Sequence, residues 1–173
     1  MAEKWALLVV DMLNDFVREG APLEVPAARE IVGHIQEEIQ KARGQGVPVI
    51  YVCDAHAPDD QEFTVWPAHA VRGTEGAQVI SELTPQPGEA VISKTRYSSF
   101  FKTDLEERLR QLGITGLVFT GVVTNICILY TAVDAVSRGY RVKVPESCVA
   151  ALSSEDHRWA LKQMREVFQM EVV

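Results

Sequence analysis

Three residue types in this 173-residue sequence could together cleave an acyl bond: a thiol, a carboxylate and an ammonium group. Cys127 follows the stretch TGVVTNI, in which Thr124 and Asn125 stand where a helix is expected to begin. A thiol becomes a thiolate near neutral pH when a cation or a helix N-terminus lies beside it. Taken alone, Cys127 favours interior packing, because free cysteines are usually buried.

Asp11 and Lys94 support the other interpretation, in which Cys127 is a nucleophile. Each ends an apolar run of strand length, and the carboxyl ends of parallel strands meet at one edge of a sheet. Alone, Asp11 would cap a turn and Lys94 would be a solvated strand end. Together, Lys94 could stabilise a thiolate, while Asp11 carries the proton from the thiol to a leaving nitrogen. Backbone N–H groups in the turn before Cys127 could hold the oxyanion.

A second group of polar residues lies between Asp54 and Gly76, a stretch longer than a usual connection between elements. Asp54 and His56 are two residues apart, so in an extended chain their side chains project to the same side. His69 could fold back to join them. Two imidazoles and a carboxylate suit a divalent metal, with Zn expected and Fe or Mn possible. The alternative is that these histidines lie on the surface without a ligand.

Apolar runs and helical patterns alternate along the chain and could position these residues. Runs typical of strands covered on both faces comprise residues 5–10, 47–52, 90–93, 116–120 and 140–144, with a short strand at 171–173. Periodic apolar positions predict helices over 26–46, 103–113, 125–139 and 153–168. The second of these helices is expected to open with a capping box of Thr103 and Glu106.

This alternation predicts an α/β fold with three layers. We expect one domain, residues 1–173, built on a doubly wound and mostly parallel sheet with Rossmann-like topology. No Gly-rich phosphate loop follows the first strand, which argues against a dinucleotide-binding module.

Composition narrows the range of partners. A net charge of −7 without a basic stripe argues against binding to nucleic acid or to an anionic membrane. The apolar run at the N-terminus is too short for a signal peptide and stops at Asp11, so we expect a cytoplasmic protein without a membrane span. The three cysteines form no C-x-x-C pair and are expected to be reduced. A small molecule is the expected partner.

Two thiols and one histidine have no chemical role in this interpretation. Cys53 extends an apolar run and faces opposite to Asp54, and Cys148 has no evident partner, so both are interpreted as packing. His157, in the stretch SSEDHRWAL, is expected to be a solvated residue in the first turn of a helix.

The stretches LLVVDMLNDF, SKTRYSSFF and TGVVTNIC contain Asp11, Lys94 and Cys127. They resemble motifs of the isochorismatase-like cysteine hydrolases, the superfamily that includes nicotinamidases and N-carbamoylsarcosine amidase. The resemblance covers nearly the whole chain in the same order. It implies that these three residues form a catalytic triad and that the chain forms a homo-oligomer. It also implies a cis peptide bond between Val122 and Val123, and an oxyanion hole made by the N–H groups of Val123 and Cys127.

The stretch DAHAPDD…WPAHAVRGTEGA also resembles the metal loop of nicotinamidases. The resemblance implies that Asp54, His56 and His69 hold a divalent ion, often zinc, which binds the pyridine nitrogen of the substrate. Phe16 and Trp66 match the aromatic residues that flank the substrate ring. Packing in the core or in a lid is the alternative for both.

Two features depart from the nicotinamidase pattern. The segment from Lys94 to Phe100 is compact, as in the isochorismatase branch, and Glu62 stands where some nicotinamidases place another histidine. Arg96 could bind a substrate carboxylate through its planar guanidinium group, or could simply be exposed.

The resulting prediction is a cysteine amidohydrolase that converts nicotinamide to nicotinate and ammonia through a thioester on Cys127. One alternative is a related hydrolase that acts on another small amide, carbamoyl or vinyl-ether compound. The other is a non-catalytic module that binds a small molecule.

Overall fold

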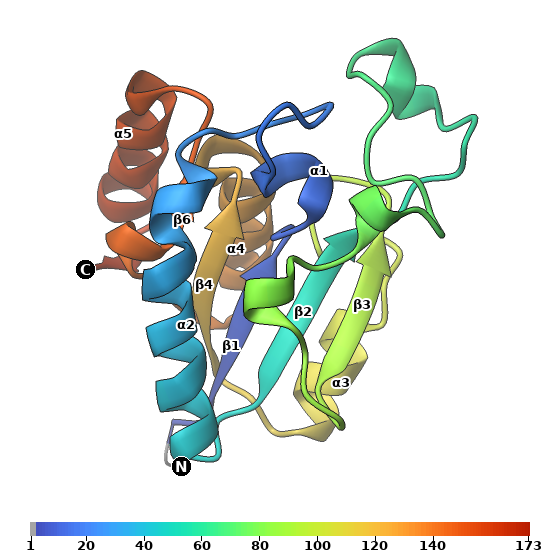
Figure 1. Ribbon diagram of the computed structural model, residues 1–173. Helices are drawn as coiled ribbons and strands as arrows, with labels where there is room; N and C mark the ends of the chain where they lie inside the picture. The colour runs from blue at the N-terminus through green and yellow to red at the C-terminus, as the bar shows by residue number, and fades with distance from the viewer. Residues whose placement is uncertain (1–2) are drawn as a thin grey trace.

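A parallel β-sheet forms the centre of the molecule in the computed structural model, which describes residues 3–173 (Figure 1). The strands in these residues are β1 (Trp5–Val10), β2 (Val49–Asp54), β3 (Ala90–Lys94), β4 (Gly116–Val122), β5 (Arg141–Val144), β6 (Val149–Ala150) and β7 (Glu171–Val172). Their order is β3-β2-β1-β4-β5-β7, and β6 pairs with the end of β4. The predicted domain begins with Met1 and Ala2, which lie outside the described residues.

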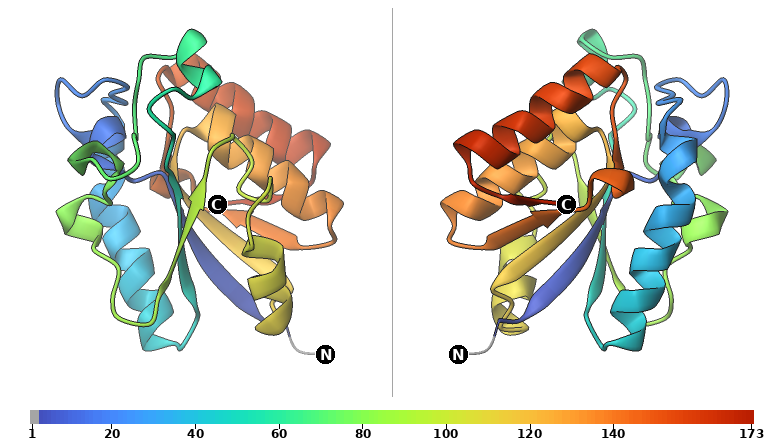
Figure 2. Two further views of the ribbon diagram at one scale, coloured as in Figure 1. Left: turned by 90° about the vertical axis from the view of Figure 1, so that its right-hand side faces the viewer. Right: turned by 90° about the vertical axis from the view of Figure 1, so that its left-hand side faces the viewer.

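Helices cover both faces of this sheet and create three layers (Figure 2). The helices are α1 (Asn14–Val17), α2 (Ala28–Gly44), α3 (Leu105–Gln111), α4 (Leu129–Ser137) and α5 (Ser154–Lys162). One apolar core lies between the sheet and α1 and α2, and the other between the sheet and α3, α4 and α5. The predicted doubly wound α/β architecture is confirmed, and every strand pairing in residues 3–173 is parallel.

The central strand β1 shows why its sequence is continuously apolar. Ala6, Leu8 and Val10 belong to the core on the α3–α5 side. Leu7 and Val9 belong to the core on the α2 side. Side chains of a strand alternate between the two faces, so a strand covered on both sides needs apolar residues at every position.

Several predicted boundaries differ from the structure. The second strand begins at Val49, after Pro48, and extends to Asp54, while the fourth extends to Val122. The short elements β6 and α1 were not predicted, because two or four residues carry no periodic signal. Helix α4 is preceded by a π-helical turn, Thr124–Ile128, which we call the Cys127 turn.

The predicted capping box at the start of α3 is wrong. The helix begins at Leu105, and no side chain caps it at Asp104. The hydroxyl of Thr103 donates to the carbonyl of Ser99 (2.5 Å) and accepts from the N–H of Leu105 (3.3 Å). The Glu106 carboxylate accepts from Arg138 on the neighbouring chain segment (3.1 Å) instead of reaching back to the helix start. Tertiary contacts therefore replace the local capping pattern.

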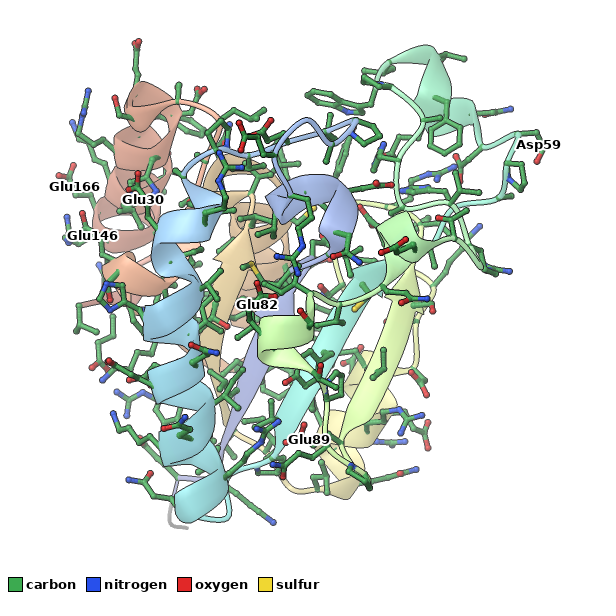
Figure 3. All side chains as sticks on the ribbon, in the orientation of Figure 1. Glu30, Asp59, Glu82, Glu89, Glu146 and Glu166 are labelled. Carbon is green, nitrogen blue, oxygen red and sulfur yellow. The ribbon has the colours of Figure 1, made fainter. Side chains whose placement is uncertain are left out.

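Several acidic side chains lie on the outer surface of the helical layers. Glu30, Glu146 and Glu166 point outward on the side formed by α2 and α5 (Figure 3). No helix in residues 3–173 has both the length and the apolar character to cross a membrane.

One glycine allows β4 to pack closely against β1 at the edge that carries the polar residues. Gly121 pairs with Val10 and has a φ angle of +114°. A Cβ atom on Gly121 would lie 2.0 Å from the carbonyl oxygen of Val10. The absence of a side chain at this position therefore brings the end of β4 beside Asp11, the residue that follows β1.

We predict that Gly121→Ala lowers the free energy of unfolding by about 3 kcal/mol or more, through the backbone clash and the positive φ angle. The control is Gly33→Ala, because Gly33 is an exposed residue of α2 and its Cβ would meet no atom within 4 Å. That change should raise stability by about 1 kcal/mol at most. Urea unfolding of both variants checks the prediction, which fails if Gly121→Ala is as stable as the control.

Candidate active site

Four polar residues from different strands meet at the carboxyl edge of the sheet. Asp11 directly follows β1, Asp54 ends β2 and Lys94 ends β3. Asp54 and Lys94 are paired in the β2–β3 register. Cys127 follows β4 in the Cys127 turn. The parallel topology therefore brings together the three residues of the predicted triad and the first predicted metal ligand.

The Lys94 ammonium group lies at the centre of this cluster and is buried. Its Nζ is 2.8 Å from Asp11 Oδ2 and 2.5 Å from Asp54 Oδ1, and it donates to Cys127 Sγ at 3.5 Å. Asp11 is fixed further, because its Oδ1 accepts the backbone N–H of Asp54 at 2.8 Å. One cation thus binds two carboxylates and the thiol in the interior of the protein.

Burial and charge determine the protonation of the two carboxylates. Burial, together with the neighbouring Asp54 charge, raises the pKa of Asp11 to about 6 in spite of Lys94. Burial opposes ionisation of Asp54 as well, but the charge of Lys94 and the hydrogen bond from His56 lower its pKa. Asp54 is therefore the permanent anion of the cluster, and Asp11 is the carboxylate that exchanges protons most readily.

The surroundings of Cys127 favour the protonated thiol. Burial raises its pKa well above the usual range, and the opposing effect of Lys94 is not sufficient because Asp11 and Asp54 lie nearby. Burial likewise disfavours the charged form of Lys94, but the two carboxylates raise its pKa well above the ordinary value. Lys94 is therefore shared between the thiol and two carboxylates.

The peptide bond between Val122 and Val123 is cis, as the family resemblance implies. The carbonyl of Val123 accepts the N–H groups of Ile126 (2.9 Å) and Ile128 (3.2 Å) and so closes the Cys127 turn. The N–H of Val123 donates no hydrogen bond within residues 3–173. Val123 and Cys127 line the same cavity.

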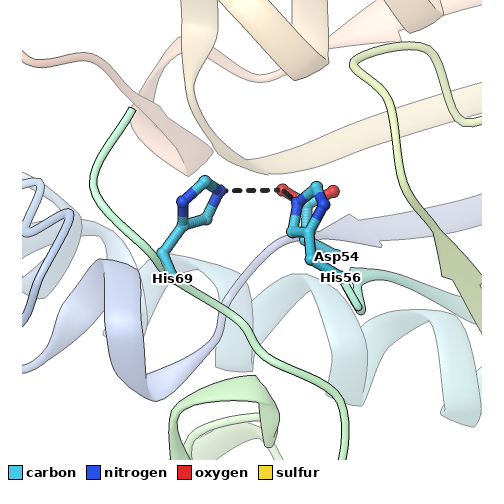
Figure 4. Close-up of side chains that lie close together, drawn as sticks. All are labelled: Asp54, His56 and His69. Atoms are coloured by element: carbon cyan, nitrogen blue, oxygen red, sulfur yellow. Dashed lines mark ion pairs between the residues drawn. The ribbon is translucent and has the colours of Figure 1, made fainter. Parts of the chain in front are cut away.

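The three predicted metal ligands come together beside this cluster (Figure 4). Asp54 Oδ2 is 3.7 Å from His56 Nε2 and 3.9 Å from His69 Nε2. All three residues are buried, and one ligand atom from each lies within 4.8 Å of the others. The extended chain at Asp54 and His56 and the returning loop at His69 produce this arrangement.

The hydrogen bonds of the two imidazoles fit a metal site. His69 Nδ1 donates to the carbonyl of Pro67 at 2.7 Å, and His56 Nδ1 lies 3.1 Å from Asp60 Oδ2. These bonds place a proton on each Nδ1 and leave both Nε2 lone pairs directed towards Asp54. His56 Nε2 is buried without a hydrogen-bond partner in residues 3–173. Two imidazole nitrogens and a carboxylate oxygen are a donor set that suits zinc.

An apolar cavity connects the thiol with the candidate metal ligands. Phe16 contacts the edge of the His69 ring, with ring centroids 5.4 Å apart, and Trp66 Nε1 donates to the hydroxyl of Tyr97 at 3.2 Å. The cavity is lined by Phe16, Leu23, Val25, Asp54, Glu62, Trp66, His69, Tyr97, Val123, Ile126, Cys127 and Leu152. Both predicted aromatic residues therefore lie in its wall.

Several residues of this wall were not predicted from the sequence. Tyr97 and Ile126 lie inside the quoted motifs, so their neighbours in the sequence were a usable signal. Leu23, Val25 and Leu152 come from connections outside those motifs and show no pattern that could have identified them.

Arg96, the candidate ligand for a substrate carboxylate, is not among the residues that line this cavity. Its Nη1 lies 3.1 Å from Asp60 Oδ1, and the side chain is 42% exposed. Asp60 in turn contacts His56 through Oδ2. Arg96 is thus neither directed at a ligand in the cavity nor free in solvent, and it supports the carboxylate that orients His56.

The fold and the site define a class of protein: a three-layer α/β protein with a buried thiol, lysine and carboxylates at the carboxyl edge of a parallel sheet. The chain belongs to the isochorismatase family, because the model of the isochorismatase domain matches residues 5–172. It is therefore an isochorismatase-family amidohydrolase.

Solved structures of three relatives superpose on the described chain. N-carbamoylsarcosine amidase from Thermoplasma acidophilum is 38% identical, with a TM-score of 0.90, and the match covers 98% of this chain and 95% of that one. Nicotinamidase PncA from Bacillus subtilis is 35% identical, with a TM-score of 0.93 over 98% of this chain and 99% of that one. Pyrazinamidase from Pyrococcus horikoshii, solved in complex with zinc, is 31% identical, with a TM-score of 0.93 and 98% of each chain covered.

We predict that Lys94→Met lowers the free energy of unfolding by about 3–5 kcal/mol, because removing one partner of a buried ion pair leaves the other uncompensated. In this cluster two carboxylates, Asp11 and Asp54, would lose their common cation. Lys41→Met is the matched control, since the Lys41 side chain is 61% exposed. Equal unfolding midpoints for the two variants in guanidinium chloride would contradict this account of the cluster.

Proposed function

We propose that this protein hydrolyses a small aromatic amide, with nicotinamide as the substrate and nicotinate and ammonia as the products. The proposal rests on one observation, the cavity beside Cys127. Cys127 lines this cavity together with two of the candidate metal ligands, Asp54 and His69, and with aromatic side chains. Phe16 and Trp66 line this space, and aromatic side chains of this kind stack against a planar ring whose amide would face the thiol. This arrangement makes acyl transfer to sulfur the natural chemistry of the site.

Asp11 is the proton carrier in the proposed reaction. Because the Cys127 thiol is protonated at rest and the pKa of Asp11 is about 6, the Asp11 carboxylate is ionised at neutral pH and accepts the thiol proton. Lys94 stabilises the thiolate as it forms, since its Nζ lies 3.5 Å from Sγ. The role of each group thus follows from its protonation state in the cluster.

The reaction then proceeds through a thioester. The Cys127 sulfur attacks the amide carbon, and the oxyanion accepts hydrogen bonds from the N–H groups of Val123 and Cys127. Asp11 returns its proton to the leaving nitrogen, which departs as ammonia as the C–N bond breaks. Water, deprotonated by Asp11, attacks the thioester carbon and releases the carboxylic acid and the free thiol.

Asp54, His56 and His69 are the residues that would hold a divalent metal, with zinc as the proposed ion. Bound there, such an ion supplies a Lewis acid that positions the ring nitrogen of the substrate. The protein side chains determine the location of this site, since Asp54 Oδ1 binds Lys94 while Oδ2 faces the two imidazoles. Asp54 thereby links substrate positioning to the nucleophile cluster.

A carbamoyl compound is the second candidate substrate, and Glu62 is the observation that favours it. The Glu62 side chain is largely buried and lines the cavity, 3.7 Å from Arg96. A carboxylate in the wall accepts hydrogen bonds from the additional N–H group of a carbamoyl substrate. Ammonia release from a panel that includes nicotinamide, pyrazinamide, benzamide and N-carbamoyl amino acids separates the two candidates.

We predict that Cys127→Ala releases no ammonia from any amide in this panel while the circular dichroism spectrum and unfolding midpoint remain close to those of the wild type. Cys148→Ala is the control, because Cys148 is buried in the core on the α2 side and should retain full activity. An active Cys127→Ala enzyme would remove the thiol from the mechanism.

We predict that the purified protein contains close to one divalent ion per chain and that His56→Ala loses both this ion and most of its affinity for nicotinamide. His34→Ala is the control, because His34 is exposed on α2 and is remote from the candidate ligands in the sequence. Elemental analysis and the Michaelis constant provide the two readouts. If wild type contains no metal and a chelator leaves the rate unchanged, the proposed metal site is wrong.

A further inference from the structure

His157 occupies a different environment from the one that the sequence predicts. It lies in the first turn of α5, but it is half-buried, and its Nδ1 is 2.9 Å from the hydroxyl of Thr124. Thr124 is fully buried and is the first residue of the Cys127 turn. The expected solvated histidine is therefore hydrogen-bonded to the segment that carries the candidate nucleophile.

No other side chain within residues 3–173 forms a hydrogen bond to the first residue of the Cys127 turn. Val123 precedes the turn and provides no side-chain cap, because valine has no polar group. The backbone bonds to its carbonyl close the turn, but they leave its own N–H without a partner in residues 3–173. The only side-chain hydrogen bond of Thr124 in the same residues is the one to His157.

Hydrogen bonds at the start of helix α5 hold His157 in place. The Ser153 hydroxyl caps the helix by accepting the N–H of Asp156 at 3.1 Å, and the N–H of His157 donates to the Ser153 carbonyl at 3.1 Å. The helix also packs directly against the Cys127 turn. The imidazole is thus anchored on a capped helix, while the hydroxyl that it binds belongs to the turn.

The surroundings of His157 favour a neutral ring. Burial lowers its pKa and the neighbouring Arg158 lowers it further, whereas Glu146 has the opposite effect. A neutral imidazole with its proton on Nε2 accepts a hydrogen bond from the Thr124 hydroxyl at Nδ1. His157 itself lines a separate surface hollow, together with Pro26, Ala150 and Ser153, and is not part of the wall of the Cys127 cavity.

We propose that His157 is a positioning residue for the reaction: by fixing the Thr124 hydroxyl it orients the Val123 N–H and Cys127 in the turn that binds the oxyanion. The inference rests on the proposed function, because it assigns His157 to the same acyl transfer. His157 does not line the Cys127 cavity, and its side chain acts through its hydrogen bond to Thr124.

Kinetics of two single variants and their double variant test this role. His157→Ala and Thr124→Val each remove one partner of the bond and should lower kcat about ten- to a hundredfold, as a small misplacement of reacting groups does. The KM and the metal content should stay near wild type. The double variant should be no slower than either single variant, because both changes break the same contact.

Rescue and control variants sharpen this test. His157→Asn places a polar atom where Nδ1 lies and should recover most of the rate. His34→Ala, an exposed histidine of α2, should leave the rate unchanged.

Alkylation of Cys127 distinguishes a positioning role of His157 from a purely structural one. Iodoacetamide attacks the sulfur of Cys127 without forming an oxyanion, so its rate should be similar in wild type and His157→Ala. If alkylation, metal content and kcat fall together, His157 has only a structural role and the inference is overturned.

Hydrogen exchange provides a readout that does not need amide hydrolysis. Amides in residues 123–128 should exchange faster in His157→Ala than in wild type, and His157→Asn should restore their protection. If wild type hydrolyses no amide, the proposed function fails while exchange still tests the contact. Unchanged exchange in His157→Ala, or an unchanged kcat in an active enzyme, would overturn the inference.

Discussion

The buried ammonium group of Lys94 is the interaction on which the rest of the site depends. It lies within hydrogen-bonding reach of two carboxylates and a thiol, and nothing else in the described cluster carries positive charge at that point. Burying an unpaired charge is costly, so the cluster must remain close to neutral overall. The negative charge of Asp54 balances the positive charge of Lys94. Asp11 and Cys127 then hold one proton between them. The chemistry of the site follows from this constraint, because one proton has to move whenever the sulfur becomes charged.

Asp54 connects this cluster to the second set of polar residues. Its Oδ1 binds Lys94, and its Oδ2 faces the Nε2 atoms of His56 and His69. A cation bound by the imidazoles would also stabilise the Asp54 charge, so the two halves of the site are electrostatically coupled. This coupling explains why one carboxylate at the end of β2 can serve both substrate positioning and the nucleophile cluster.

The sequence predicted the parts of the structure that repeat a simple physical pattern. The apolar run of β1 predicted a strand covered on both faces. Because the carboxyl ends of parallel strands meet at one edge of a sheet, the sequence also predicted that Asp11, Lys94 and Cys127 lie together. The spacing of Asp54 and His56 predicted their common direction. These predictions succeeded because each depends on local periodicity or on the topology of the whole sheet.

Features set by contacts between distant segments could not be predicted in the same way. The Val122–Val123 cis bond was accessible only through the family resemblance, and the capping box at Thr103 failed because Ser99 captures its hydroxyl. Arg96 and His157 were misplaced for a similar reason: their partners, Asp60 and Thr124, lie more than thirty residues away in the sequence. The protonation of Cys127 belongs to this group too, since it depends on three side chains from three other strands. Ultraviolet difference absorption between wild type and Cys127→Ala tests the protonation state of Cys127 most directly. The account predicts no thiolate absorption from Cys127 in the resting enzyme at neutral pH, whereas a thiolate band that disappears in Cys127→Ala would contradict it.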